Sequence, residues 1–413
     1  MQVVIIGNGI AGSSAAFAIR EASDNTKITV ISKEPHPLYS PCALPNFLAG
    51  EIERDRLFIN THQHYADSDI ATILGHEVNQ IDTKSSRVIL DNGSLAFDRL
   101  IFAAGSQPAV LPIEGRAKPG VFNLKRLADA DSITASPGKK AVIIGSGMIG
   151  MEAAIALKKQ GWKVVVIEFL DWVLPRIFDE RPAQKLRAIV EDHDIEVLTG
   201  ERVQKIAGDS QVSGVATDKR EIDCDLVLTA AGMRPNVELA KQTGLTIGKF
   251  GGICTDEYMR TNIENIYACG DCAETKDAIT GRSQCSLLWH NAKEQGVVAG
   301  LYSIGIKKRY PGSRNISGIT IFATYAFSIG GASAGIGYDN VEIIEREYNN
   351  DYRRFIITEG RVIGAQVIGS NRYIGMLLGI MRRGDTISRI WQGKLNQNFG
   401  ALPLMAITKN YLV

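Results

Sequence analysis

The chain has 413 residues, of which 45% are hydrophobic and 22% are charged, and 46 Lys and Arg nearly balance 45 Asp and Glu. This length exceeds what one hydrophobic core can organise and predicts two or three domains. The balanced charge, without a basic block, argues against a nucleic acid partner. An apolar strand opens the chain with no signal-like segment, and the longest apolar stretch contains three glycines, so we expect a cytoplasmic protein without a membrane span.

The N-terminal segment has the pattern strand, glycine-rich turn, helix, strand. Apolar residues 3–6 precede Gly7-Asn8-Gly9-Ile10-Ala11-Gly12, a helix rich in small residues covers 13–22, and a second apolar strand at 28–31 precedes Glu34. In such a turn the first glycine permits the tight bend, the second lets the backbone approach a pyrophosphate, and the third allows close helix packing. The segment therefore predicts a dinucleotide site.

The same pattern returns in the middle of the chain. Apolar residues 141–144 precede Gly145-Ser146-Gly147-Met148-Ile149-Gly150, and the next strand, at 164–167, ends at Glu168. The repeat continues, because residues 78–105 resemble residues 203–232 and each reads as a β-meander followed by a buried strand. We interpret this as a duplicated Rossmann-like domain with a small meander insert in each copy.

The acids after the second strands indicate which dinucleotide binds. Glu34 lies 22 residues after Gly12, and Glu168 lies 18 residues after Gly150, where a carboxylate would meet a ribose 2′-hydroxyl. A 2′-phosphate would be repelled there, and no arginine directly follows Glu168. The second site is therefore expected to prefer NADH over NADPH.

The C-terminal part of the chain has a different pattern. From Ser317 onward we expect strands at 341–347, 354–358 and 361–368 and helices after Tyr373, which predicts a third, α+β domain. The overall class is therefore α/β, with an α+β domain added at the end.

Together these motifs resemble the pyridine nucleotide-disulfide oxidoreductases, in particular the branch of the NADH oxidases and coenzyme A-disulfide reductases. The resemblance rests on the two glycine turns and on the segments 104–108, 232–236, 267–271 and 292–296. It implies an FAD domain at 1–112 and 248–316, an NAD domain at 113–247, and a dimerisation or interface domain at 317–413. It also implies that Asp271 binds the flavin ribityl chain, that Glu34 binds the adenosine ribose and that Glu152 lies near the nicotinamide.

The cofactors expected are FAD and NADH, and the candidate residues form two sets. Catalytic candidates are Cys42 and Glu152. Cofactor-binding candidates are Gly7, Gly9, Ala11, Gly12, Glu34, Ala104, Gly105, Gly145, Gly147, Gly150, Glu168, Gly232, Gly270 and Asp271. The histidines follow no metal-ligand pattern, and Cys269 and Cys272 belong to the Cys-Gly-Asp-Cys motif, so no metal site is expected.

Cys42 is the most informative single residue. It lies in Ser40-Pro41-Cys42-Ala43-Leu44-Pro45, which resembles the single-cysteine active-site segment of that branch. If Cys42 opens a helix toward Ala49, the helix N-terminus would favour its thiolate. The alternative is a small buried thiol without chemistry.

The sequence leaves the electron acceptor open. Ile10 occupies the position where peroxide-handling members carry a histidine, and the first turn resembles rubredoxin reductases, nitrite reductases and the NADH-oxidising subunit of phenylglyoxylate dehydrogenase. Electrons leave either through Cys42 to a disulfide, persulfide or oxygen, or from flavin to a ferredoxin, rubredoxin or iron–sulfur partner. We expect a homodimer or a subunit of a larger redox complex. A non-catalytic, FAD-stabilised assembly protein is the third alternative.

Overall fold

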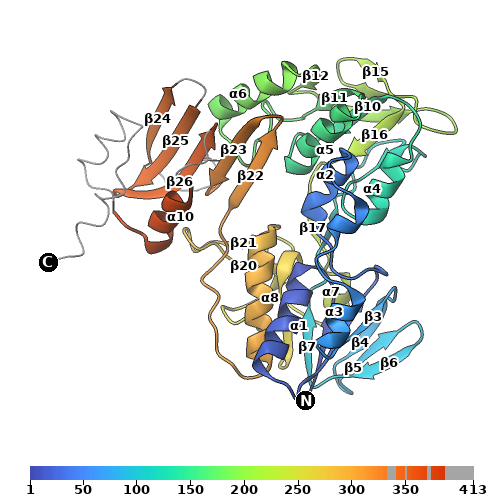
Figure 1. Cartoon of the computed structure of the whole chain (residues 1–413), viewed down its shortest axis with the longest axis vertical. Helices are drawn as coiled ribbons and strands as arrows, with labels where there is room; N and C mark the ends of the chain where they lie inside the picture. The colour runs from blue at the N-terminus through green and yellow to red at the C-terminus, as the bar shows by residue number, and fades with distance from the viewer. Residues whose placement is uncertain (333–340, 349–350, 370–373, 387–413) are drawn as a thin grey trace. The chain divides into compact units, whose positions relative to one another are not determined.

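The computed structural model describes residues 1–332, 341–348, 351–369 and 374–386 (Figure 1). Contacts within the chain divide it into two compact units. The first unit comprises Met1–Val173 and Val190–Asn315, and the second comprises Leu174–Ile189 and the residues from Ile316 onward. Within the described ranges, no helix combines the length and the apolar content needed to cross a membrane. The predicted domain boundaries at 112, 247 and 316 stay a prediction.

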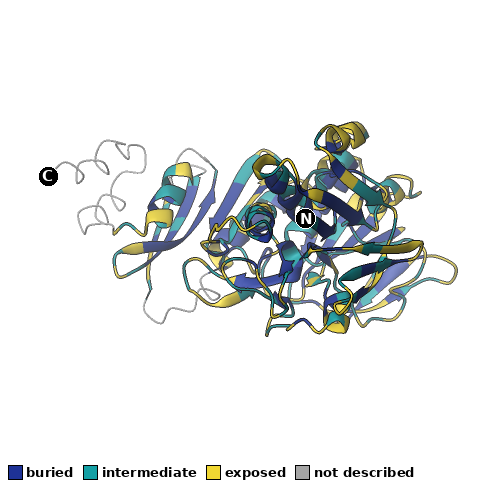
Figure 2. Cartoon of the chain, turned by 90° about the horizontal axis from the view of Figure 1, so that it is seen from below, coloured by how far each residue is buried: buried dark blue, intermediate teal, exposed yellow. Residues whose placement is uncertain are grey.

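The first module of unit 1 is a five-stranded parallel sheet in the order β19-β7-β1-β2-β3. Its strands are β1 (Gln2–Ile6), β2 (Lys27–Ser32), β3 (Ile70–Leu74), β7 (Arg99–Phe102) and β19 (Ile266–Ala268). Apolar residues such as Val4 and Ile5 are fully buried, as expected for a parallel sheet that is covered on both faces. Figure 2 shows this burial along the strands in dark blue.

Helices α1 (Ile10–Ala22) and α8 (Trp289–Ser303) pack against each other in this module. Their backbones approach closely because α8 carries glycines at the contact. A Cβ on Gly296 would lie 2.1 Å from the Ala11 carbonyl oxygen, and one on Gly300 would lie 2.5 Å from that of Ala15. Small side chains on both helices therefore determine how α1, and with it the first glycine turn, is positioned.

The second module repeats the first. Its parallel sheet has the order β12-β11-β10-β16-β9, and helix α5 (Met148–Lys159) follows the first strand as α1 does. Its strands are β9 (Val121–Phe122), β10 (Lys140–Ile144), β11 (Lys163–Ile167), β12 (Ile195–Leu198) and β16 (Leu226–Thr229). The register agrees between the copies, since Ile6 pairs with Ile31 in one and Ile144 with Ile167 in the other. The predicted duplication is confirmed at this level.

Smaller sheets and helices complete unit 1. Each module carries the predicted antiparallel meander: β4 (Val78–Asp82), β5 (Arg87–Leu90) and β6 (Gly93–Ala96) in the first, and β13 (Val203–Ala207), β14 (Gly214–Thr217) and β15 (Glu221–Asp223) in the second. The remaining strands are β8 (Ser106–Pro108), β17 (Met233–Pro235), β18 (Ile253–Cys254), β20 (Ala273–Lys276) and β21 (Ser283–Cys285). The remaining helices are α2 (Leu44–Leu48), α3 (His62–Asp67), α4 (Leu127–Thr134) and α7 (Glu238–Thr243).

Unit 2 contains an antiparallel sheet in the order β22-β23-β26-β25-β24, together with α10 (Ile374–Arg383) and most of α6 (Glu180–Glu191). Its strands are β22 (Ile316–Ile321), β23 (Thr324–Ile329), β24 (Glu342–Tyr348), β25 (Asp351–Thr358) and β26 (Arg361–Ile368). The three later strands and the helix agree with the predicted α+β pattern. The C-terminal end of the predicted interface domain, 387–413, lies outside the described residues.

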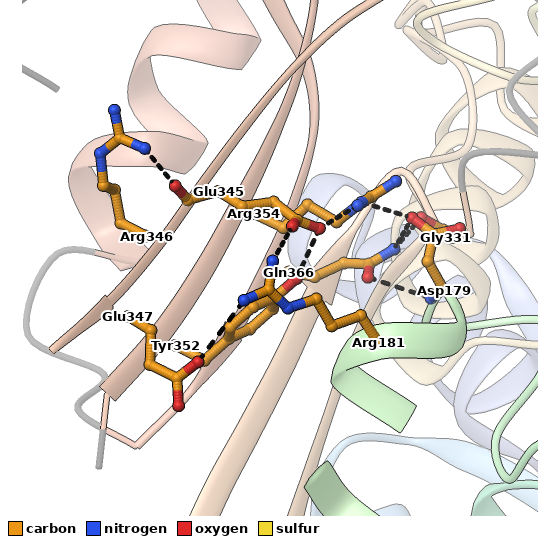
Figure 3. A network of polar contacts seen from close by, with 9 residues as sticks. All are labelled: Asp179, Arg181, Gly331, Glu345, Arg346, Glu347, Tyr352, Arg354 and Gln366. Carbon is orange, nitrogen blue, oxygen red and sulfur yellow. Dashed lines mark hydrogen bonds and ion pairs between the residues drawn. The ribbon is translucent and has the colours of Figure 1, made fainter. Parts of the chain in front are cut away.

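A polar network holds the segment before α6 to this sheet (Figure 3). The Arg354 guanidinium contacts Asp179 at 2.8 Å and also pairs with Glu345. The Gln366 side chain donates to Asp179 Oδ2 at 3.1 Å and accepts from the Asp179 backbone N–H at 3.1 Å. Because the Arg354 and Asp179 side chains are nearly buried, removing one partner would leave the other charge unpaired.

Candidate functional site

The two glycine turns have nearly the same backbone geometry. Gly7 has φ +110° and Gly145 has φ +102°, a region that residues with a Cβ rarely adopt. A Cβ on Gly7 would lie 2.1 Å from the Ala103 carbonyl oxygen, and one on Gly145 would lie 2.7 Å from that of Ala230. Glycine is therefore required at the first position of each turn, because the chain passes tightly against the neighbouring parallel strand.

The later glycines of each turn leave space for a ligand and bring the helix close. A Cβ on Gly9 or Gly147 would have no other atom within 4 Å, whereas one on Gly12 or Gly150 would lie 1.9 or 2.0 Å from the carbonyl oxygen of the first glycine. Neither α1 nor α5 has a side chain capping its N-terminus. The first-turn amides therefore remain available to a pyrophosphate, so both turns fit a dinucleotide.

The acid of the first module is held by a tyrosine that reaches the second. The Tyr39 hydroxyl donates to Glu34 Oε2 at 2.7 Å and accepts from the backbone N–H of Leu127, the first residue of α4, at 3.1 Å. Burial raises the pKa of Tyr39, and the nearby Glu34 raises it further. Tyr39 thus stays a neutral donor and orients Glu34, the predicted ligand of the adenosine ribose.

The acid of the second module is bound by its own glycine turn. Glu168 is only 8% exposed. Its Oε2 accepts from the Ser146 backbone N–H at 2.8 Å and from the Ser146 hydroxyl at 2.7 Å, and its Oε1 accepts from the Leu170 N–H at 2.9 Å. These three hydrogen bonds hold the carboxylate in one orientation at the end of β11.

The two modules are joined where the short strands β8 and β17 meet. Strands β8 and β17 pair in antiparallel fashion, with Gln107 opposite Arg234. The Asn236 side chain donates to the Ala104 carbonyl at 2.8 Å, and its backbone N–H donates to the Gly105 carbonyl at 2.9 Å. A Cβ on Gly105 or Gly232 would meet no other atom within 4 Å. The predicted residues Ala104, Gly105 and Gly232 therefore lie together at this junction.

Asp271 lies at the same junction. Its Oδ2 accepts from the Ser106 hydroxyl at 2.6 Å and lies 3.7 Å from the Lys125 ammonium. The preceding Gly270 has φ +76° and packs against α1, because a Cβ there would lie 2.8 Å from that of Ala11. Asp271 is therefore brought next to the first glycine turn, and its role at the flavin ribityl chain stays a prediction.

Cys42 also lies in this region. It is exposed and occupies a 3₁₀ turn, Pro41–Ala43, ahead of the five-residue α2, so the predicted helix from Cys42 toward Ala49 is wrong at its start. The protein packed around the side chain raises the pKa of the Cys42 thiol, Glu152 raises it further, and Lys125 lowers it. The expected stabilisation of the thiolate by a helix N-terminus is therefore not what the structure provides.

Glu152 projects from α5 and influences the Cys42 thiol electrostatically. Burial raises the pKa of Glu152 to about 7. The carboxyl group can therefore gain or lose a proton near neutral pH, beside a thiol that must itself lose a proton to react.

A cavity of about 150 Å³ lies at the N-terminus of α5. It is lined by Gly147, Met148, Ile149, Asn123, Leu124, Thr229, Ala230, Gly232, Met233 and Pro108. The Thr229 hydroxyl donates to Asn123 Oδ1 at 2.7 Å, which joins two sides of the cavity. The second glycine turn therefore opens onto a space that Gly232 also borders.

Several residues at these sites were missed by sequence reasoning. Lys125, Ser106, Tyr39 and Ser146 were not predicted as site residues, although Ser146 lies within the second glycine turn and Ser106 within the segment 104–108. The expectation that Cys269 and Cys272 bind no metal stays a prediction. Both are buried, and within the described ranges no group of three or more His, Cys, Asp or Glu side chains gathers as a metal site.

These features agree with a known family. A model of the pyridine nucleotide-disulphide oxidoreductases matches residues 1–296, which include both glycine turns, Cys42 and Asp271. The chain belongs to this family. An NADH oxidase of Methanocaldococcus jannaschii is 34% identical over 397 residues, covering 90% of this chain and 88% of that protein. A nitrite reductase [NAD(P)H] of Bacillus subtilis is 30% identical over 94% of this chain, which spans 48% of that protein.

A solved structure supports the same assignment. The NAD-dependent persulfide reductase from A. fulgidus superposes with a TM-score of 0.89 at 32% identity, covering 94% of this chain and 77% of that one. This family member is therefore an FAD-dependent NADH oxidoreductase that passes electrons to an acceptor, as predicted. When bound, FAD would supply the acceptor for the hydride of NADH and the carrier of the electrons that leave. That the two turns, the two acids and the junction position these cofactors stays a prediction.

Proposed function

We propose that the acceptor is a small disulfide or persulfide and that it is reduced through Cys42. The observation that carries the proposal is the position of this exposed thiol beside Lys125, Asp271 and Glu152, where the two modules meet. Such a thiol is accessible to a small sulfur compound from solvent and lies next to the proposed flavin site. The similarity to a persulfide reductase supports this choice.

The reaction proceeds in two steps at the sulfur. The Cys42 thiolate attacks the acceptor's S–S bond, forms a mixed disulfide and releases one thiolate. Two electrons, which originate from NADH, then cleave the mixed disulfide to regenerate the Cys42 thiolate and release the second thiolate. In total, NADH, one proton and a disulfide give NAD⁺ and two thiols, whereas a persulfide gives NAD⁺, one thiol and hydrogen sulfide. Glu152 holds or releases a proton next to the Cys42 sulfur.

The site residues take the predicted roles in this proposal. The first turn, Glu34 and Asp271 bind FAD, and the second turn and Glu168 bind NADH. Residues 1–112 and 248–316 then form the FAD domain, and residues 113–247 form the NAD domain. We place an interface to a second copy, or to another redox subunit, in residues 317–413, and the location in the cytoplasm remains part of the proposal.

The experiment replaces Cys42 and compares acceptors. Cys42→Ser should keep its flavin and its reduction by NADH but lose nearly all turnover with disulfides and persulfides, because Cys42 is the exposed cysteine of the described residues, whereas Cys272 beside Asp271 is buried. Cys254→Ser, which removes a half-buried thiol from β18, is the matched control and should keep turnover.

A second candidate function is single-electron transfer to an iron–sulfur partner. The raised pKa of Cys42 favours it, since a neutral thiol is a poor nucleophile, and so does the similarity to a nitrite reductase. In that case Cys42→Ser would keep full activity with ferredoxin or viologen dyes and the wild type would reduce no disulfide.

A further inference from the structure

The loop that carries the ribose acid is closed in the same way in both modules. In each module, two backbone N–H groups after the neighbouring edge strand donate to carbonyls of this loop. In the first module Gly75 donates to Glu34 and His76 to Ser32. In the second module Gly200 donates to Leu170 and Glu201 to Glu168. The modules can therefore be compared position by position. Lys33 in the first corresponds to Phe169 in the second, and Glu77 corresponds to Arg202. The two acids themselves are offset by two positions, because Glu168 corresponds to Ser32.

The side chains at these two positions interact differently. In the first module Lys33 and Glu77 form an ion pair at 2.7 Å, so the two charges cancel. In the second module the Arg202 guanidinium lies 4.7 Å from the centre of the Phe169 ring. Phe169 is 56% exposed and carries no charge. The guanidinium is thus positioned by a ring contact, while its N–H groups remain available to an anion.

The other charges around this loop are accounted for. Lys219 donates to the Gly200 carbonyl at 2.8 Å, and Glu201 is buried and paired with Arg220 at 3.2 Å. Asp171 follows on the loop of Glu168, and Asp218 accepts from the Arg202 backbone N–H at 2.9 Å. Arg202 directly follows Glu201, whose backbone N–H donates to the Glu168 carbonyl, so its guanidinium is a positive charge close to this loop.

We propose that Arg202 is a specificity-determining residue that receives the 2′-phosphate of NADPH and so opposes Glu168. The inference rests on the proposed placement of the adenosine ribose at Glu168. There the carboxylate accepts a hydrogen bond from a 2′-hydroxyl and repels a 2′-phosphate, whereas a guanidinium binds phosphate through paired N–H groups. NADH is then the preferred donor and NADPH a weaker one, and the balance between Glu168 and Arg202 determines the ratio.

The experiment measures binding to the FAD-loaded full chain by calorimetry, with adenosine 2′,5′-bisphosphate and adenosine 5′-monophosphate as probes. Arg202→Met should weaken binding of the bisphosphate about tenfold, since a hydrogen-bonded charge pair is lost, and change that of the monophosphate much less. The affinity of Arg202→Lys for the bisphosphate should lie between those of the wild type and Arg202→Met, because lysine keeps the charge but loses the planar guanidinium. Glu168→Gln should strengthen bisphosphate binding about tenfold, and Arg202→Met added to it should remove that gain.

The control is Arg87→Met, which removes one positive charge from the meander of the first module and should leave the affinities for both probes unchanged. If Arg202→Met binds the bisphosphate as tightly as the wild type does, while Glu168→Gln strengthens it, the role of Arg202 is wrong and the ribose placement stands. If Glu168→Gln changes neither probe, the ribose placement itself is wrong, and the inference falls with it. The ratio of kcat/KM for NADPH and NADH, measured with a viologen dye, should follow the bisphosphate affinities and does not depend on the acceptor proposed for Cys42.

Discussion

The two modules agree at their glycine turns, the proposed phosphate end of each site, and differ around the acid at the proposed sugar end. Gly7 and Gly145 have nearly the same backbone angle and nearly the same close contact to a neighbouring strand. In contrast, Glu34 is held by a tyrosine that also binds the other module, whereas Glu168 is held by Ser146 of its own turn. Backbone sterics therefore explain the shared turn in both copies, while the side chains that hold the acid differ between them.

The largest expected effect comes from the shared turn. Gly7→Val should abolish flavin binding, because a Cβ cannot fit 2.1 Å from the Ala103 carbonyl oxygen. Gly145→Val should keep flavin but abolish its reduction by NADH, because the strain falls on the second module. Flavin content by absorbance and anaerobic reduction by NADH distinguish the two variants. Loss of flavin in Gly145→Val would show that the modules do not bind their ligands separately.

The second effect concerns a difference between α1 and α5, the helices that follow the two glycine turns. Counting from the last glycine of each turn, Glu152 of α5 corresponds to Ser14 of α1. Burial raises the pKa of Glu152 from 4.5 to about 7, so the folded protein favours the neutral acid. The resulting stabilisation is complete below pH 4.5 and is lost as the pH rises through 7.

Glu152→Gln removes this titration. The melting temperature of the wild type should therefore fall relative to that of the variant between pH 5 and pH 8, by the equivalent of roughly 2 kcal/mol after solvent screening. Thermal melts of the flavin-loaded proteins at several pH values measure the difference. Parallel curves for the two proteins would contradict the assigned pKa. The same variant should also speed alkylation of Cys42 by iodoacetamide, because one negative charge is removed from beside the thiol.

A third effect tests the connection between Glu34 and the second module. Tyr39→Phe removes the donor to Glu34 and the acceptor for the Leu127 N–H, so it should lower the free energy of unfolding by roughly 1–2 kcal/mol. It should also weaken FAD binding, because Glu34 loses its orientation. Flavin release during dialysis and denaturant unfolding measure both effects. Weaker NADH binding with unchanged FAD binding would show that Tyr39 supports the site of the second module and not that of the first.

The smallest effect is expected at the acid of the second module. Ser146→Ala removes one of the three hydrogen bonds to Glu168 and keeps the two from backbone amides. KM for NADH should rise about threefold with little change in kcat, because a single neutral donor is lost. Steady-state kinetics with a viologen dye check this. A large fall in kcat would mean that Ser146 acts on the reacting end of the dinucleotide instead.

The sequence by itself determined the repeated part of this protein. Two glycine turns, two strand-end acids and two meanders are local patterns, because φ/ψ sterics and the alternation of apolar residues act over a few neighbouring positions. Gly7, Gly145, Glu34 and Glu168 could therefore be predicted without coordinates. The unusual turn at Cys42 was predicted less well, since Pro41 and Pro45 flank it and short helices depend on packing more than on propensity.

Only the tertiary structure decided which groups surround these residues. Lys125 and Ser106 reach Asp271 from positions 146 and 165 residues away, and no local pattern encodes such an approach. The same holds for Arg202, since no arginine directly follows Glu168 in the sequence, whereas the edge strand of the sheet brings one to Phe169 from 33 residues further on. Charge balance at a site depends on distances through space, and these are determined by how strands pair and not by their order in the chain.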